Sequence, residues 1–511
     1  MKIERTKNAT RNIVYGVVLK IYQLLVPFVV RTAMIYVMGT KYLGLGSLFT
    51  SVLSVLNLTE LGVGAAMVFS MYKPIAEDDE EKICALMRLY KLYYRVIGLV
   101  ILVVGVAITP IVPQLVKGSV PDGISLIVLY YLNLGTTVLT YWLFAYKNSL
   151  LQAHQRLDVT SKVTIVNSTL LYVLQIGAIF LKNYYLYVIV GLATTALGNI
   201  CTAVIVNKMY PQYKAQGKLP KQEVKAINRR IKDLFTAKLG SVIVSSVDSI
   251  VISAFIGLST LGVYNNYYYI MSSVMGFITI IFNSCLAGIG NSIVTESREK
   301  NYNDFKLMSF IVGWIMAVCI PCFLCLYQPF MKLWVKYKEN MLPDDTIILF
   351  CVYFFVCEIS MVWATYKDAA GIWHEDRFRP LIGALANLFM NIVFVKAFGM
   401  GIYGILLSTI LSYILISMPW LVHNLFHRVF QMSYLEYLKE IVKLLFMIFI
   451  ICVVSYFICL NINCNLIAQI VIKGIVCFVV SNAIIVLVYF RTGEFNRAKS
   501  IFKGMILRKR G

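Results

Sequence analysis

The sequence contains little charge for its length. Only 14% of its 511 residues are Asp, Glu, Lys or Arg, while 59% are hydrophobic. Together with a mean hydropathy of +0.76, this composition lies far outside the range of soluble globular proteins. A soluble enzyme or binding domain is therefore excluded, and we expect a polytopic membrane protein.

Histidine is nearly absent, with four residues in the chain. His423 and His427 have the i, i+4 spacing of a helical ligand pair, but the nearby sequence offers neither a third ligand nor an acid. We expect no metal site and no cofactor.

The twelve cysteines are scattered through apolar runs and not through loops, where a disulfide framework would form. Cys319, Cys322 and Cys325 recur every third residue, a spacing that could gather thiols around a metal. Pro321 interrupts this set, and no histidine or carboxylate is near. The sequence therefore favours ordinary packing of these thiols.

About fourteen apolar runs of roughly 20 residues or more are each long enough to cross a bilayer of about 30 Å as a helix. They lie near 12–38, 43–72, 84–112, 123–150, 158–181, 184–208, 230–256, 261–293, 304–328, 344–370, 378–398, 401–427, 436–460 and 465–490. The connections on one side are short, which excludes a separate extracytoplasmic domain. No cleavable signal peptide is expected, because the first run is long and carries internal charges.

Most of the 47 basic residues fall on one set of connections, which includes the N-terminus, the connection 208–232 and the C-terminus. The positive-inside rule places these segments in the cytoplasm, so both termini are cytoplasmic and the number of spans is even. The basic loops thus indicate topology and contact with anionic lipid, and no nucleic-acid partner is expected.

A repeat joins the two halves of the chain. Residues 38–45 match residues 256–263 at an offset of 218, and the same offset places Lys20 on Lys238. Repeats separated by an even number of spans have parallel topology and are related by an axis along the membrane normal. The basic connection 211–230, punctuated by Gly and Pro, is expected to link the halves.

The first span carries Lys20 and Arg31, and unpaired cations inside a span face a protein interior or a wet cavity. A single helical face contains Gly16, Lys20, Gln23, Pro27 and Arg31. Lys20 and Lys238 each lie about 12 Å from the cytoplasmic end of their spans, with Arg31 about 17 Å farther along. The alternative for both lysines is extension of the side chain to the membrane surface.

Acidic residues within spans offer two interpretations. Glu60 and Asp248 could form a coupling or gating site, or could pair structurally with Arg31 or Lys238. Structural pairing is favoured for Glu60, because Gly62 and Gly64 indicate close packing beside it. Glu358, Lys367 and Asp368 in the tenth span could form a further network.

Several motifs resemble those of Wzx-type polysaccharide flippases, a branch of the multidrug/oligosaccharidyl-lipid/polysaccharide exporter superfamily. These motifs occur in both halves in the same order as in the family, so the resemblance covers essentially the whole chain. They are YLGLGSLF (42–49), LTELGVGA (58–65), MYKP (71–74), VDSIVIS (247–253), GVYNNYY (262–268), DAAGIW (368–373), DRFRP (376–380) and Asn387.

The resemblance implies an all-α polytopic fold of two pseudo-symmetric six-helix bundles, at 1–210 and 231–430, joined by the basic cytoplasmic linker 211–230. Residues 431–511 would add two helices and a basic cytoplasmic tail. The implied activity is translocation of undecaprenyl-diphosphate-linked oligosaccharide across the bacterial cytoplasmic membrane by alternating access. Lys20, Arg31 and Lys238 would bind the diphosphate, and helices near 436–460 and 465–490 would form a groove for the lipid tail.

The remaining expectations concern partners, energy and sugar. Membrane lipids are expected partners, and polysaccharide polymerases and glycosyltransferases are candidates; Na⁺, H⁺ or the membrane potential could drive transport. Asn265, Asn266 and Tyr267 could contact sugar, although an interfacial aromatic belt explains this run equally well.

Two other functions remain open. An ion-coupled exporter of drugs or small amphiphiles would share the architecture but favour an acidic, aromatic cavity. A polysaccharide polymerase or ligase would need a long outer loop, which the short connections argue against.

Overall fold

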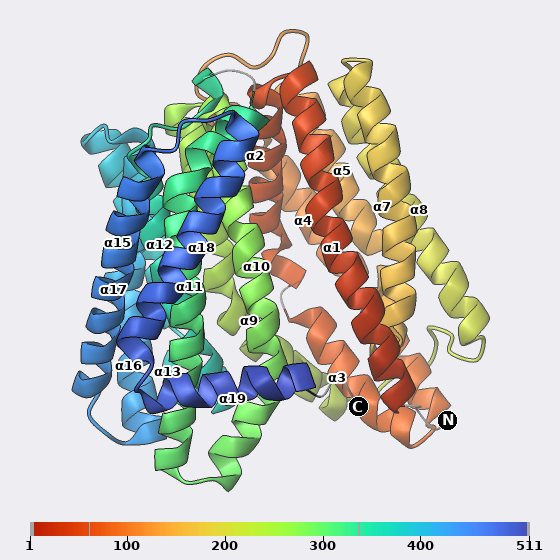
Figure 1. The fold of residues 1–511 in the computed structure, drawn as a ribbon. Helices are drawn as coiled ribbons and strands as arrows, with labels where there is room; N and C mark the ends of the chain where they lie inside the picture. The colour runs from red at the N-terminus through yellow and green to blue at the C-terminus, as the bar shows by residue number, and fades with distance from the viewer. Residues whose placement is uncertain (1–4, 61, 336–337, 508–511) are drawn as a thin grey trace. The chain divides into compact units, whose positions relative to one another are not determined.

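The computed structural model describes residues 5–60, 62–335 and 338–507 (Figure 1). All regular elements within these ranges are helices. Ten described helices are long and apolar enough to cross a membrane, and the bent pair Leu126–Trp142 and Ala145–Ala153 would make an eleventh. All fourteen predicted runs coincide with helical segments, which confirms the all-α polytopic fold class.

The contacts divide the chain into two compact units, Met1–Gly262 and Val263–Gly511. The first unit contains α1 (Arg5–Val37), α2 (Thr40–Leu56), η1 (Asn57–Glu60), α3 (Val63–Ala76), α4 (Glu80–Ala107), η2 (Thr109–Leu115), α5 (Leu126–Trp142), η3 (Ala145–Lys147), α6 (Asn148–Ala153), α7 (Leu157–Phe180), α8 (Tyr184–Met209), α9 (Lys221–Val251) and η4 (Ile252–Ile256).

The second unit begins inside α10 (Leu258–Thr295). It continues with α11 (Arg298–Trp334), η5 (Lys338–Asn340), α12 (Thr346–Ala369), α13 (Trp373–Asp376), α14 (Arg379–Ile392), η6 (Val393–Ala397), α15 (Gly401–Ser412), η7 (Tyr413–Ser417), α16 (Met418–Asn424), η8 (Leu425–Phe430), α17 (Leu435–Leu460), α18 (Leu466–Tyr489) and α19 (Gly493–Leu507).

The boundary between the units lies beyond the predicted linker, because α9 packs against α2 and α3 of the first unit. The linker itself is anchored to α4. Arg88 donates to the carbonyl of Gly217 at 3.0 Å, and Lys82 pairs with Glu223 at 2.9 Å. The predicted division into two six-helix halves and a C-terminal pair stays a prediction.

The repeat has a direct structural counterpart. α2 begins at Thr40 and α10 begins at Leu258, which are equivalent positions at the offset of 218. Their preceding residues, Gly39 and Gly257, both have positive φ, at 104° and 138°. Glycine adopts this backbone without the steric penalty of a Cβ. The two copies therefore start their helices by the same turn.

The two repeat segments also pack on each other reciprocally. A Cβ on Gly44 would lie 2.0 Å from the carbonyl oxygen of Leu258, and a Cβ on Gly262 would lie 2.2 Å from that of Thr40. In the repeat, position 40 is equivalent to position 258, and position 44 to position 262. The two close approaches are therefore related to each other by local two-fold symmetry. Small residues permit such close backbone approach between membrane helices.

The second unit is centred on α11, which packs against α12, α17 and α18. α19 runs crosswise to α11 and α18 (Figure 1) and contacts α11. Arg497 of α19 pairs with Asp304 of α11 at 2.6 Å, and Phe495 stacks on Trp314 with ring centroids 5.6 Å apart. Side-chain contacts on both faces of this crossing thus fix α19 to α11.

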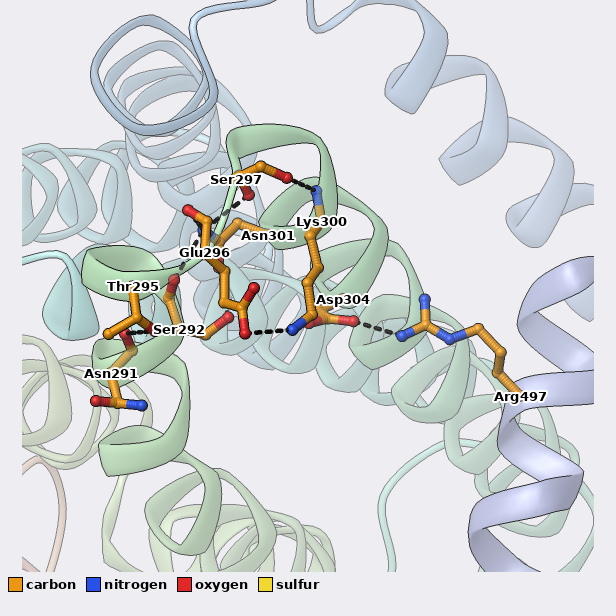
Figure 2. Close-up of polar contacts among 9 residues, drawn as sticks. All are labelled: Asn291, Ser292, Thr295, Glu296, Ser297, Lys300, Asn301, Asp304 and Arg497. Carbon is orange, nitrogen blue, oxygen red and sulfur yellow. Dashed lines mark hydrogen bonds and ion pairs between the residues drawn. The ribbon is translucent and has the colours of Figure 1, made fainter.

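The turn between α10 and α11 is closed by Asn301, as Figure 2 shows. Its amide donates to the carbonyl oxygens of Ser292, Glu296 and Ser297, and its side-chain oxygen accepts from the Ser292 hydroxyl. Ser297 caps α11 by accepting from the backbone of Lys300. The bonds to Ser292 and Glu296 thereby join the first turn of α11 to the end of α10.

His154 in the turn between α6 and α7 is 4% exposed. Its Nδ1–H donates to the carbonyl of Leu150 at 2.9 Å, and its ring lies against that of Tyr210, with centroids 4.4 Å apart. Nε2 has no hydrogen-bond partner among the described residues. Burial lowers the pKa of His154 from its usual value, so the folded protein holds the neutral imidazole.

Acidification is therefore expected to destabilise the protein through His154. As pH falls below about 6.5, the unfolded chain takes up the proton before the folded chain does, and stability decreases. The melting temperature in detergent should drop by several degrees between pH 7.5 and pH 5.5. His154→Phe should flatten this dependence, while His427→Phe, a change at an exposed residue, should leave it intact. An unchanged slope in His154→Phe would contradict this role.

Candidate functional site

The cationic face of the first span is formed as predicted. Lys20 and Arg31 both lie on α1, and eleven residues of helix place them within about 20° of each other around the axis. Lys20 is exposed and Arg31 is partly buried. Arg31 also lies close enough to Tyr187 of α8 to interact with it electrostatically.

α1 packs on α7 by a different face. Tyr22 shares a hydrogen bond with Thr169 at 2.8 Å, and Lys162 lies over the ring of Tyr15. Tyr22 points about 200° away from Lys20 around the helix. The cationic face is therefore not used for packing on α7.

This face is covered at one end of α1 and open at the other. Val30, Met34 and Ile35, which flank Arg31, are 5%, 1% and 6% exposed. Lys20 and Gln23, on the N-terminal half of the same face, are exposed. A ligand that approaches α1 from its N-terminal end can reach Lys20 first, with Arg31 deeper along the same face.

Lys238 lies in α9, which packs against α2 and α3. Its side chain is outside the part of the structure that can be described. The predicted meeting of Lys20 and Lys238 across a shared cavity therefore stays a prediction.

Glu60 lies where the second predicted span breaks between α2 and α3. Its carboxylate accepts from the Tyr94 hydroxyl at 3.2 Å, and Tyr90 in turn donates to Tyr94 at 2.7 Å. Tyr141 of α5 stacks edge-on to Tyr94 and donates to Asn57 at 3.2 Å. A carboxylate surrounded by three tyrosines is thus built from η1, α4 and α5.

The break beside Glu60 rests on α9. Gly62 has φ of 88°, and a Cβ on it would lie 2.6 Å from the Cβ of Leu234. A Cβ on Gly64 would lie 3.2 Å from Oε1 of Glu60. The close packing that the two glycines predicted is confirmed, and it places Glu60 against the helix that carries Lys238.

These tyrosines could not be identified as neighbours of Glu60 from the sequence. The only available signal was the i, i+4 spacing of Tyr90 and Tyr94 on an apolar helix. Nothing in the sequence linked them to Glu60, since they come from a different helix.

Asp248 is 7% exposed in α9, beside the buried Ser246 and Ser249. Farther along, Ser253 in η4 donates to the carbonyl of Leu115 at 2.6 Å, which fixes this end of the helix to η2. Asp248 thus belongs to a polar stretch inside the first unit. A coupling or a structural role for Asp248 stays a prediction.

The predicted sugar-contact residues lie in the second unit on α10. Tyr267 is fully buried, donates to Gln328 at 3.0 Å and accepts from the backbone of Leu342 at 3.2 Å. Asn266 is also fully buried, whereas Asn265 is partly exposed. Tyr267 packs inside the unit and not in an aromatic belt, and sugar contact by Asn265 stays a prediction.

Part of the predicted network on the tenth span is formed. Lys367 pairs with Asp368 at 2.6 Å and with Asp376 at 3.1 Å, and Arg379 reaches Asp376 at 2.5 and 2.9 Å. Asp376 is 3% exposed. Glu358 is 2% exposed and its Oε2 has no partner among the described residues. The acidic motif near 376 thus holds the end of α12 to the start of α14.

The predicted groove helices correspond to α17 and α18, which pack on each other and on α11. Large apolar side chains on their other faces are exposed, among them Phe446, Phe449, Phe457, Ile475 and Phe478, at 58% to 65%. These faces are suited to contact with hydrocarbon.

Residues 9–287 match the family described as "Polysaccharide biosynthesis protein". No curated protein matches the sequence. Among solved structures, the lipid II flippase MurJ in an inward closed conformation is 15% identical. It aligns over 94% of this chain and 100% of its own, with a TM-score of 0.63.

Two further structures share the fold. An inward-facing multidrug resistance MATE family transporter of the MOP superfamily is 14% identical over 78% of this chain and 93% of its own, with a TM-score of 0.60. A MOP superfamily transporter from Pyrococcus furiosus is 14% identical over 81% of this chain and 94% of its own, with a TM-score of 0.52. At these identities the likeness concerns the fold.

Proposed function

Because the chain belongs to the family of polysaccharide biosynthesis proteins and has the fold of MOP-superfamily flippases and exporters, we propose that it flips a lipid-linked oligosaccharide. The substrate would be an undecaprenyl-diphosphate-linked repeat unit, carried from the cytoplasmic to the outer leaflet of the bacterial cytoplasmic membrane. The fold shared with MurJ, a lipid II flippase, supports this class of substrate.

The observation that carries the proposal is the cationic face of α1. A diphosphate cannot cross hydrocarbon without compensation of its charge. Lys20 is open at the N-terminal end of this face and Arg31 lies about 17 Å deeper on it. With the N-terminus in the cytoplasm, Lys20 would receive the diphosphate and Arg31 would hold it farther along the path, with Lys238 as a third cation.

The prenyl tail requires a different surface, because it remains in lipid while the head crosses. The exposed apolar faces of α17 and α18 are candidates for that contact. Head and tail would then use separate surfaces of one protein, and alternating access of the repeats would move the head.

The decisive experiment follows leaflet transfer of a lipid-linked oligosaccharide in reconstituted vesicles. Lys20→Ala and Arg31→Ala are each expected to lower the initial rate by at least tenfold, because each removes a charged contact with the diphosphate. Lys73→Ala serves as the matched control, since Lys73 is 81% exposed and pairs only weakly with Glu77.

Three outcomes separate the candidate functions. Full transfer by both variants would refute the cationic path. Transport of small amphiphilic cations without transfer of lipid-linked glycan would favour a drug exporter. Elongation of the glycan by the purified protein would favour a polymerase.

A further inference from the structure

Three thiols meet in the second unit, from helices far apart in sequence. Cys325 of α11, Cys459 of α17 and Cys477 of α18 are 6%, 2% and 0% exposed. Their Sγ atoms all lie within 4.8 Å of one another. Within 5–60, 62–335 and 338–507, no other group of three metal-ligating side chains is as close.

The surrounding helices hold this group in place. α11, α17 and α18 pack on one another in all three pairs. The Cys477 thiol donates to the carbonyl of Pro321 at 3.5 Å, so its Sγ is oriented from α11. Cys322, one turn before Cys325, packs against the group and supplies a fourth sulfur nearby.

The arrangement differs from the one that the sequence indicated. Cys319, Cys322 and Cys325 recur along one helix, and packing was favoured for them. The cluster keeps Cys325, has Cys459 and Cys477 in place of Cys319 and Cys322, and forms across three helices. Pro321 does not interrupt it, because α11 continues through this residue and its carbonyl serves as an acceptor.

We propose that Cys325, Cys459 and Cys477 form a binding site for a soft, thiol-seeking cation, with Cu(I) as the ion that fits best. Metal–sulfur distances of about 2.3 Å place sulfurs about 3.8 Å apart, so the thiols need to close by about 1 Å at most. Thiolates select soft ions such as Cu(I). Cu(I) is satisfied by two or three sulfurs, whereas Zn²⁺ would also need Cys322 to complete four.

Binding of Cu(I) by two thiolates breaks two S–H bonds and releases two protons to water, which leaves one net negative charge at the site. Cys459 precedes the last residue of α17, and the connection to α18 follows directly. Partly buried Ile462 of this connection packs on the cluster. We therefore expect an ion to enter from that end, past Ile462.

A bound ion would cross-link α17 and α18 to α11. It would stabilise the folded protein by an amount that rises with the logarithm of the free ion concentration above Kd, because the unfolded chain does not hold the three sulfurs together. This metal cross-link would involve α11, α17 and α18 alone, and it is independent of the cationic face of α1.

The test uses the full-length purified protein under reducing, anaerobic conditions. Cu(I) is titrated in competition with a chromogenic Cu(I) chelator, and Zn²⁺ is titrated separately. We expect one Cu(I) per chain, bound at least tenfold more tightly than by the variant with all three cysteines changed to alanine. Sulfur-only coordination should appear in X-ray absorption, and Cu(I) should raise the melting temperature of the wild type.

Cys351→Ala is the matched control, because Cys351 is a buried thiol of the same unit that donates to Ile320 and is not part of the cluster. It should bind Cu(I) like the wild type. Equal binding by the wild type and the triple variant, or equal loss in Cys351→Ala, would overturn the proposal. Binding of Zn²⁺ but not Cu(I) would overturn the choice of ion. Failure of the wild type to compete with the chelator for Cu(I) would overturn the proposal even if a variant fails to fold.

Discussion

Gly44→Ala is expected to lower the free energy of unfolding by about 3 kcal/mol or more, the upper range for overpacking. The added Cβ would lie 2.0 Å from the backbone oxygen of Leu258, and a backbone atom cannot move aside as a flexible side chain can. Because the contact is reciprocal, Gly262→Ala should cost a similar amount. The melting temperature in detergent and the yield of monodisperse protein measure the loss.

Gly177→Ala is the matched control, since Gly177 lies within α7 with nothing within 4 Å of an added Cβ. Alanine is favoured over glycine inside helices by about 1 kcal/mol, so this variant should be unchanged or more stable. The double variant at 44 and 262 should lose less than the sum of the single losses, because both residues serve one contact. Normal stability of both single variants would disprove the reciprocal packing.

The second large effect concerns Asp376, which joins two cations in the second unit. Asp376→Asn removes the buried charge that faces Lys367 at 3.1 Å and Arg379 at 2.5 Å. Breaking a buried ion pair by removing one partner costs about 3 to 5 kcal/mol, because the other charge stays buried. The remaining acid, Asp368, is 46% exposed, pairs with Lys367 at 2.6 Å and accepts a hydrogen bond from Trp373 at 3.2 Å. We expect a loss of about 3 kcal/mol, seen as a lower melting temperature.

An exposed ion pair provides the comparison. Glu77→Gln breaks the ion pair between Glu77, whose side chain is 56% exposed, and Lys73, whose side chain is 81% exposed. This change should alter the free energy of unfolding by less than about 0.5 kcal/mol. Combining Lys367→Met with Asp376→Asn should cost less than the two changes separately, since the double variant no longer buries an ammonium that has lost its buried partner Asp376. Additive losses would show that Lys367 and Asp376 do not interact.

The helices could be predicted from the sequence because each run of apolar residues is long enough to span a bilayer by itself. The break at Glu60 and Gly62 could not be, because the cause lies outside the run. Gly62 adopts positive φ where it packs on Leu234 of α9, and hydropathy carries no record of that contact. The boundary between the two units could not be predicted for the same reason, because it depends on the packing of α9 against α2 and α3.

The part of the candidate site that lies on a single helix could be predicted, because the spacing of residues along a helix determines which of them share a face. Lys20 and Arg31 share a face by spacing alone, and the structure adds that this face is open at Lys20 and covered near Arg31. Residues brought together from separate helices could not be predicted, as with Tyr94 and Glu60 or Cys459 and Cys477. Tyr267 illustrates the opposite case, in which a residue type suited to sugar binding proves to be fully buried.

The glycine crossing also has a mechanical consequence. Where side chains interlock, helices resist turning against each other, because every rotation must lift side chains out of their grooves. At Gly44 and Gly262 backbone meets backbone with no side chains between them. Turning the start of α10 on α2 there, inside the first unit, would therefore break the Thr40–Ser259 hydrogen bond of 3.2 Å but would lift no side chain out of a groove at the two glycines.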